Sequence, residues 1–350
     1  MRKMAAPLIG CLLALSVVPP VFAQDVPNTQ HSAVPSSSPA PEAESVDHRV
    51  KIGFAGIGDY TMFSQTPTSV SQVGTVASQA DLRAARVVLT QNISKNFYWY
   101  FAPNYNGFVT PPDQLFSIYD LYLAYKSPIG LLTIGKQKET FVYEMAALAA
   151  NLPQQERVLS PFFLSRAVGV KLTNTALGQR MTWALGWYPF YYDGSQTTAR
   201  LTGVPYITGD NAEWVHLGVD YRYVGNTYGK LRFRGKPESD IAPNFVDTGS
   251  FTGNYANELN YELVATTKPI SLYSEFSKAW VNAPLSQNPV FFGYYAELAW
   301  AITGETRRTI ATLVTDCGSS RKSLPAHMSS WYAFRATIST AERFRAATWA

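Results

Sequence analysis

Large apolar residues alternate with small or polar residues along much of the chain between residues 50 and 302. The clearest case is the segment MTWALGWYPF, residues 181–190. Its large apolar positions are Met181, Trp183, Leu185 and Trp187. Side chains of a β-strand point to opposite faces with a period of two, so the pattern predicts strands rather than helices.

The same period predicts about twelve strands, separated by turn residues. Their predicted ranges are 50–60, 82–93, 97–105, 117–126, 131–137, 167–174, 181–190, 214–224, 229–234, 257–265, 271–280 and 291–302. The connections alternate between short and long. The third long connection, residues 138–166, is the longest.

This asymmetry of the connections decides between two all-β architectures. A soluble β-sandwich has no reason to place all its long loops at one end, whereas a barrel that crosses a membrane has tight turns on one side and long loops on the other. We therefore predict a transmembrane, antiparallel up-and-down β-barrel. The aromatic run of residues 187–192 is then expected at the level of the lipid headgroups.

Alternation also assigns each strand residue to the lipid or to the lumen. Residues predicted to face lipid include Tyr119, Leu121, Leu217, Val219, Leu231 and Phe233. Residues predicted to face the lumen include Asp120, His216, Asp220, Arg222, Lys230, Arg232 and Arg234. Charges thus fall largely on one face, as expected when a basic side chain facing lipid at mid-membrane costs on the order of 2 to 4 kcal/mol.

The N-terminus predicts export. Arg2 and Lys3 precede an apolar run that ends before Pro19, and Val21-Phe22-Ala23 is typical of a cleavage site, so residues 1–23 are predicted to be a signal peptide. A lipoprotein box at residues 8–11 is the alternative. Residues 24–47 form a Pro- and Ser-rich linker, residues 48–304 the barrel, and residues 305–350 an atypical tail.

Composition excludes global disorder and a disulfide framework. Hydrophobic residues make up 46% of the 350-residue chain and charged residues 15%. Of the two cysteines, Cys11 lies in the signal peptide and only Cys317 follows it. The net charge of +4 arises in the tail, where residues 305–350 hold seven Lys or Arg and three acids. Nothing here predicts binding to nucleic acid.

Several stretches resemble the phosphate-selective porin O and P family of Gram-negative outer-membrane porins. They are DLRAARVVL (81–89), IYDLYLAYKSPIGLLTIGKQKETF (118–141), LSPFFLSRAVGVKL (159–172), QRMTWALGWY (179–188) and GYYAELAWAITGE (293–305). The resemblance implies a homotrimer of sixteen-stranded barrels in outer-membrane lipid. It also implies a channel for small anions such as phosphate, with no enzyme activity and no cofactor, in which the long third loop narrows the pore.

The charged residues near this loop and on the lumenal parity are the candidate site. Pore-lining or anion-binding candidates are Arg83, Arg86, Lys126, Lys136, Lys138, Arg166, Lys171, Arg222, Lys230, Arg232 and Arg234. The acids of the loop are Glu139, Glu144 and Glu156. Family members often carry an adjacent arginine pair where this chain has Arg83-Ala84, and Arg86 shares the parity of Ala84. Because lumenal acids nearly balance these bases, a general small-solute porin is an alternative.

The end of the chain departs from the resemblance. The family continues past the TGE motif into four more strands, whereas residues 309–350 show no useful alternation. We therefore expect a frameshifted or truncated reading frame, with a divergent C-terminal helix as the alternative. A barrel that lacks its last strands would leave two strand edges unpaired in lipid.

Two further classes remain as alternatives, a plugged barrel that acts in binding or adhesion and an outer-membrane hydrolase. The strand region offers only His48 and His216 as histidines and contains no Gly-x-Ser-x-Gly motif, which disfavours the hydrolase. The few histidines and the absence of a cysteine pair predict no metal site.

Overall fold

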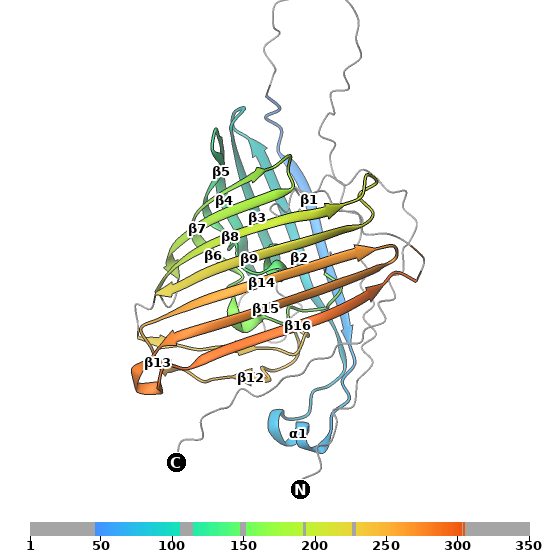
Figure 1. Cartoon of the computed structure of the whole chain (residues 1–350), viewed down its shortest axis with the longest axis vertical. Helices are drawn as coiled ribbons and strands as arrows, with labels where there is room; N and C mark the ends of the chain where they lie inside the picture. The colour runs from blue at the N-terminus through green and yellow to red at the C-terminus, as the bar shows by residue number, and fades with distance from the viewer. Residues whose placement is uncertain are drawn as a thin grey trace, which may run out of the picture.

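Twelve long strands pair with their neighbours along the chain to form one antiparallel sheet (Figure 1). The computed structural model describes residues 46–105, 115–147, 152–191, 194–225, 229–302 and 304. The predicted all-β, up-and-down antiparallel architecture is confirmed. Within this part of the chain, no helix has the length and apolar character needed to cross a membrane.

The wall strands have the following bounds: β1 Lys51–Thr61, β2 Gln79–Asn92, β3 Phe97–Tyr105, β4 Phe116–Ser127, β5 Gly130–Lys138, β6 Arg166–Ala176, β7 Met181–Tyr191, β8 Gly194–Ile207, β9 Trp214–Gly225, β14 Tyr255–Thr267, β15 Ile270–Asn282 and β16 Val290–Trp300. Short helices lie between strands: α1 Pro67–Val73, α2 Tyr143–Ala146, η2 Ser160–Phe162 and η3 Pro284–Ser286. Four two-residue strands, β10 Lys230–Leu231, β11 Arg234–Gly235, β12 Val246–Asp247 and β13 Phe251–Thr252, lie in the connection from β9 to β14.

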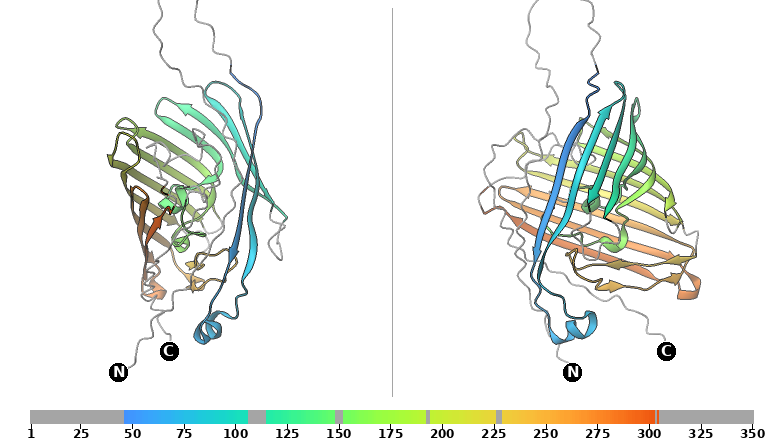
Figure 2. Two further views of the ribbon diagram at one scale, coloured as in Figure 1. Left: turned by 90° about the vertical axis from the view of Figure 1, so that its right-hand side faces the viewer. Right: turned by 180° about the vertical axis from the view of Figure 1, so that it is seen from behind.

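The sheet curves strongly, and its two ends, β1 and β16, do not pair with each other (Figure 2). Within the described residues the wall is thus an open trough rather than a closed barrel. The expected sixteen strands are not present there. Residues 1–45 and 305–350 lie outside the described residues, so the predicted signal peptide, most of the linker and the tail stay predictions.

Strand β8 corrects the predicted strand list. Residues 194–207 fall between the predicted strands 181–190 and 214–224, because their outward positions include Thr197, Ala199 and Gly203, which give little apolar alternation. Conversely, the alternating residues 229–234 do not belong to the wall. They form the inward-folded β10 and β11, and β9 pairs directly with β14.

The two faces of the wall differ as alternation predicts. On β9, Leu217 is 49% exposed on the outside, whereas Asp220 is 1% exposed and His216 is fully buried on the inside. Leu185 and Trp187 of β7 also project outward. An apolar outer face with charged groups on the other side is the surface that a hydrocarbon layer requires.

Tyr119 of β4 corrects one of the predicted faces. Ala102 pairs with Asp120 and Pro103 with Ile118, so Tyr119 is the extra residue of a β-bulge. A bulge interrupts the period of two. Tyr119 and Asp120 therefore both lie on the inner side, whereas Ile118 and Leu121 stay outside.

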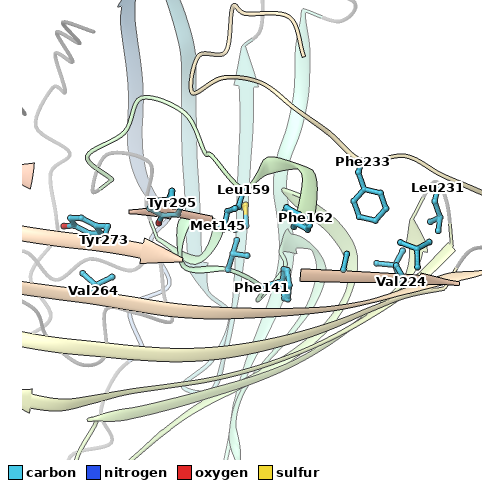
Figure 3. Packing of buried hydrophobic residues seen from close by; sticks show 14 of the residues in the cluster. Phe141, Met145, Leu159, Phe162, Val224, Leu231, Phe233, Val264, Tyr273 and Tyr295 are labelled. Atoms are coloured by element: carbon cyan, nitrogen blue, oxygen red, sulfur yellow. The ribbon is translucent and has the colours of Figure 1, made fainter. Parts of the chain in front are cut away.

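The hydrophobic core lies inside the trough, between the wall and the connection 139–165 (Figure 3). This connection supplies Phe141, Met145, Leu159 and Phe162, and the wall supplies residues such as Tyr273. Leu231 and Phe233, which alternation predicted to face lipid, also pack here. Their prediction was wrong because residues 229–234 are not part of the wall.

Candidate pore constriction

The connection 139–165, here called the constriction loop, is bound to the inner face of β9 and β15 by main-chain hydrogen bonds. The N–H of Val142 donates to Asp220 Oδ2 at 3.2 Å. The N–H groups of Tyr143 and Glu144 donate to the two carboxylate oxygens of Glu275 at 2.7 and 3.0 Å. Two wall carboxylates therefore hold the start of α2 inside the trough, as expected for the third long loop.

Arg222 of β9 ties both ends of this loop to the wall. Its guanidinium lies 3.0 Å from Glu258 Oε2 and 3.4 Å from Glu139 Oε2, and it donates to the carbonyl of Phe162 at 2.9 Å. Arg222 is 4% exposed. Its charge is consequently shared between two buried carboxylates, and its role in this arrangement is to position the loop.

Glu144 organises the loop from within. Its carboxylate accepts hydrogen bonds from the N–H groups of Val158 and Leu159 at 2.9 and 3.0 Å and from Gln154 Nε2 at 2.9 Å. Burial of this carboxyl group raises the pKa of Glu144 to about 7. Burial likewise raises the pKa of Glu139 to about 7, against the lowering effect of Arg222.

The opposite wall holds the loop through Arg83 of β2. Its Nε lies 2.9 Å from Asp59 Oδ2 and its Nη1 lies 3.2 Å from Glu156 Oε2, and it also binds the carbonyl of Gln155. Arg83 can face inward beside Ala84 because β2 carries an extra residue between the partners of Ile57 and Gly58. Both walls of the trough thus contact the constriction loop.

Arg86 and Arg166 enclose the ring of Tyr119. Both guanidinium carbons lie 3.4 Å from the ring centroid, a cation–π arrangement. Arg166 is also paired with Asp120 Oδ1 at 3.0 Å. No ion pair within the described residues joins Arg86 to a carboxylate, and its Nε is buried without a hydrogen-bond partner there. Of the inward-facing arginines predicted for the site, Arg86 is the one without an ion-pair partner within the described residues.

Three of the five lysine candidates lie in different environments on the wall. Lys171 pairs with Thr133 and Gly186 on the inner face. Lys138, at the end of β5, donates to the carbonyls of Met145 and Ala147 at 3.0 Å. Lys126 is exposed beside the short turn that follows β4.

Lys136 faces outward, contrary to the pore-lining prediction. Its register partners are Leu121 and Val168, both of which are exposed on the outer face. Residues directly opposite each other in a sheet share a face. The prediction relied on the proximity of Lys136 to the loop, whereas alternation along the strand determines the side.

The three bases of residues 230–234 do not line the wall either. Lys230, Arg232 and Arg234 are exposed on the connection between β9 and β14. Arg232 Nε donates to Asp247 Oδ1 at 2.7 Å, and this hydrogen bond lowers the pKa of Asp247 to about 2. The predicted faces of this segment are thus reversed. Its bases are exposed and its apolar residues lie inside, because the apolar residues fill the core.

Sequence reasoning missed Arg200, which lies in β8. Arg200 donates to both carboxylate oxygens of Glu262 at 2.9 Å and lies 3.2 Å from Asp220 Oδ1. His216 Nε2 lies 2.6 Å from Glu262 Oε2. A β-carbon on Gly218 would lie 2.4 Å from the same oxygen, so the glycine leaves room for this carboxylate. The inward alternation of Thr198, Arg200 and Thr202 could have revealed β8.

Residues 58–309 match the model of the phosphate-selective porin O and P family. The chain belongs to this family. Among solved structures it is similar to in-vitro folded OmpT, an outer membrane protein of Vibrio cholerae. The trimer form matches with 10% identity and a TM-score of 0.44 over 72% of this chain and 73% of that chain. A second OmpT structure matches with 11% identity and a TM-score of 0.45 over 75% and 74%. No curated protein matches the sequence.

For a porin, the inner surface divides into two kinds of site. Around Arg200 and Arg222 every base is paired with buried carboxylates. These bases therefore hold the structure together and add little net positive charge to the lumen. Around Tyr119, Arg86 supplies positive charge without a carboxylate partner in the described chain. Within those residues no group of three or more His, Cys, Asp or Glu could hold a metal ion.

Proposed function

We propose that the chain forms the wall of an outer-membrane porin through which small anions such as phosphate diffuse passively. The observation that carries this proposal is the sorting of side chains across the wall. Leu185, Trp187 and Leu217 are exposed on the outside, whereas Arg86, Arg166 and Asp220 lie inside. Family membership supports the same function.

The preference for anions is supported by the Arg86–Tyr119–Arg166 stack. Two guanidinium groups share one ring, and only Arg166 has an ion-pair partner, Asp120, among the described residues. In a narrow passage with low-dielectric walls, such an unbalanced charge raises the local concentration of counter-ions. Small anions would therefore be enriched at the constriction.

A general small-solute porin is the second candidate. It is favoured by the pairing of Arg200 with Glu262 and of Arg222 with Glu258, which removes two strong bases from the field inside the pore. If these pairs dominate the potential, Arg86 alone would give only weak selectivity.

Location and partners follow from the porin proposal. We expect residues 1–23 to direct export through the inner membrane, the outer face to contact outer-membrane lipid, and three copies to assemble. Within the described residues β1 and β16 each have one unpaired edge, which lipid cannot satisfy, so the working pore needs strands or a partner that close them.

The test is conductance of the full chain in a planar lipid bilayer under a potassium chloride gradient. An anion-selective porin gives a reversal potential of the sign expected for chloride, and Arg86→Gln moves it towards zero. Arg180→Gln, in the short turn after β6, is the charge-matched control and should leave it unchanged. A reversal potential near zero in the parent chain would favour the general porin. Lack of any conductance would reject the porin proposal.

A further inference from the structure

The outer face of the wall carries two lysines among residues that are otherwise uncharged. By strand register, Lys136 of β5 and Lys278 of β15 are the charged residues at outward-facing positions of the described wall strands. The terminal register pair, Lys138 and Arg166, shares this parity, but its side chains bind the constriction loop and Asp120. A charge on such a face requires a reason, because hydrocarbon does not solvate it.

Lys278 lies in an otherwise apolar part of this face. Its register partners are Leu259 of β14 and Phe292 of β16, and Phe276 is two residues away on the same side. Its ammonium group lies 4.8 Å from the ring centroid of Trp280, which is two residues closer to the long-loop end of β15. The charge is thus directed towards that end, as in a lysine whose head group reaches the membrane interface.

A polar side chain lies on the neighbouring strand at the level of Trp280. Trp280 pairs with Asn257 of β14, and the hydroxyl of Tyr221 donates to Asn257 Oδ1 at 2.7 Å. This hydrogen bond orients the Asn257 side chain and leaves its amide nitrogen as a hydrogen-bond donor. Tyr223 and Tyr255 form an adjacent ring pair at 5.8 Å. A cation, an amide and an aromatic belt together suit an anionic headgroup at a membrane interface.

We propose that Lys278, Asn257 and Trp280 bind the phosphate of an anionic lipid in the outer leaflet. This inference rests on the proposed function, which turns the long-loop end of the wall outward. The charge complementarity is direct, because Lys278 is a cation on an uncharged surface. The ligand is a lipid rather than the permeating solute, because the wall separates Lys278 from the lumen.

Retention of lipid by the purified full chain tests this site. The protein in detergent is mixed with equal amounts of phosphatidylglycerol, which carries an anionic phosphate, and phosphatidylcholine, which is zwitterionic. Native mass spectrometry then gives the ratio of the two retained lipids. We expect phosphatidylglycerol to exceed phosphatidylcholine about fivefold, the factor for one lysine near an anionic surface. Lys278→Gln should bring the ratio close to one, and Lys278→Arg should preserve it.

Lys268→Gln is the matched control, because Lys268 lies in the short turn of the same β14–β15 hairpin and is paired with Asp210 at 3.5 Å. It should keep the parent ratio. An unchanged ratio in Lys278→Gln would overturn the proposal, as would an equal loss in Lys268→Gln. A change of oligomeric size without a change of lipid ratio would assign this surface to a second copy and also overturn it. Conductance is measured separately, so a closed channel that still selects phosphatidylglycerol rejects only the porin function.

Discussion

The two sides of the trough hold the constriction loop in different ways. On β9 and β15, buried carboxylates accept main-chain N–H groups of Val142, Tyr143 and Glu144, and Arg222 links both ends of the loop. On β2, Arg83 makes the ion-pair contact to the loop, while Arg86 nearby stacks on Tyr119. Both sides therefore bind the loop, but only the second carries an inward-facing arginine, Arg86, without a carboxylate partner in the described residues.

The largest expected effect is the loss of unfolding free energy when Arg222 is replaced. Removal of its side chain in Arg222→Ala leaves Glu258 and Glu139 buried without their cation. Loss of one partner of a buried pair destabilises a protein by about 3 to 5 kcal/mol. Urea titration of the detergent-folded protein should show this loss of unfolding free energy, whereas Arg86→Ala should lose about 2 kcal/mol, as for a desolvated cation–π contact. Equal losses of unfolding free energy in the two variants would contradict the difference between the two sides of the trough.

Glu275→Ala should give the next largest effect, because four groups donate to this carboxylate. They are the N–H groups of Tyr143 and Glu144, Asn260 Nδ2 and the hydroxyl of Tyr295. Each buried donor left without a partner costs about 1 to 3 kcal/mol, and partial rearrangement should limit the total to a few. The freed loop should also become sensitive to trypsin at Arg157. Ser274→Ala, on the outer parity of the same strand, should leave the loop resistant.

The stability of the folded protein should depend on pH through the buried acids of the constriction loop, Glu144 and Glu139. The pKa of Glu144 is raised to about 7 from an ordinary value of 4.5, so the folded chain binds its proton more tightly than the unfolded chain. Stability from this group is present below about pH 4.5 and is lost as the pH rises to about 7, by at most about 3 kcal/mol. Unfolding free energy measured between pH 4.5 and 7.5 should fall with pH, and Glu144→Gln should flatten the slope. Glu139 contributes in the same direction, so a residual slope should remain.

The smallest expected effect concerns Lys136. Because this side chain faces outward between Leu121 and Val168, Lys136→Leu should leave the reversal potential unchanged. Its stability should change by less than about 1 kcal/mol, as for lipid-facing charges near the interface. A shift of the reversal potential as large as that of Arg86→Gln would contradict the outward placement.

Sequence alternation predicted the architecture and much of the inner surface. It succeeded on β9, where Leu217 and Asp220 follow a strict period of two. It failed at Tyr119, because a bulge adds a residue that no local pattern marks. It also failed for β8, whose outward residues are weakly apolar. Alternation detects a strand only when its two faces differ in polarity. The two faces of β8 differ little, because its outward residues are small or weakly apolar.

The candidate site was less predictable than the wall. The resemblance and the loop length indicated that residues 139–165 fold inward, but neither indicated their partners. The bonds from this loop to Asp220 and Glu275 join residues more than seventy positions apart in the sequence. Arg222 was predicted to face the lumen and does so, yet its carboxylate partners make it an anchor. Compensation of a charge depends on such distant partners and is not encoded in local spacing.

Gly218 shows how the wall makes room for its charges. Its missing side chain is the space that the Glu262 carboxylate occupies when it bridges Arg200 and His216. A β-carbon there would lie 2.4 Å from Glu262 Oε2, so the end of this flexible side chain would have to shift relative to Arg200 and His216. The size of the residue at position 218 therefore sets where the Glu262 carboxylate lies. In a library of variants at this position, we expect alanine to be depleted less than larger residues.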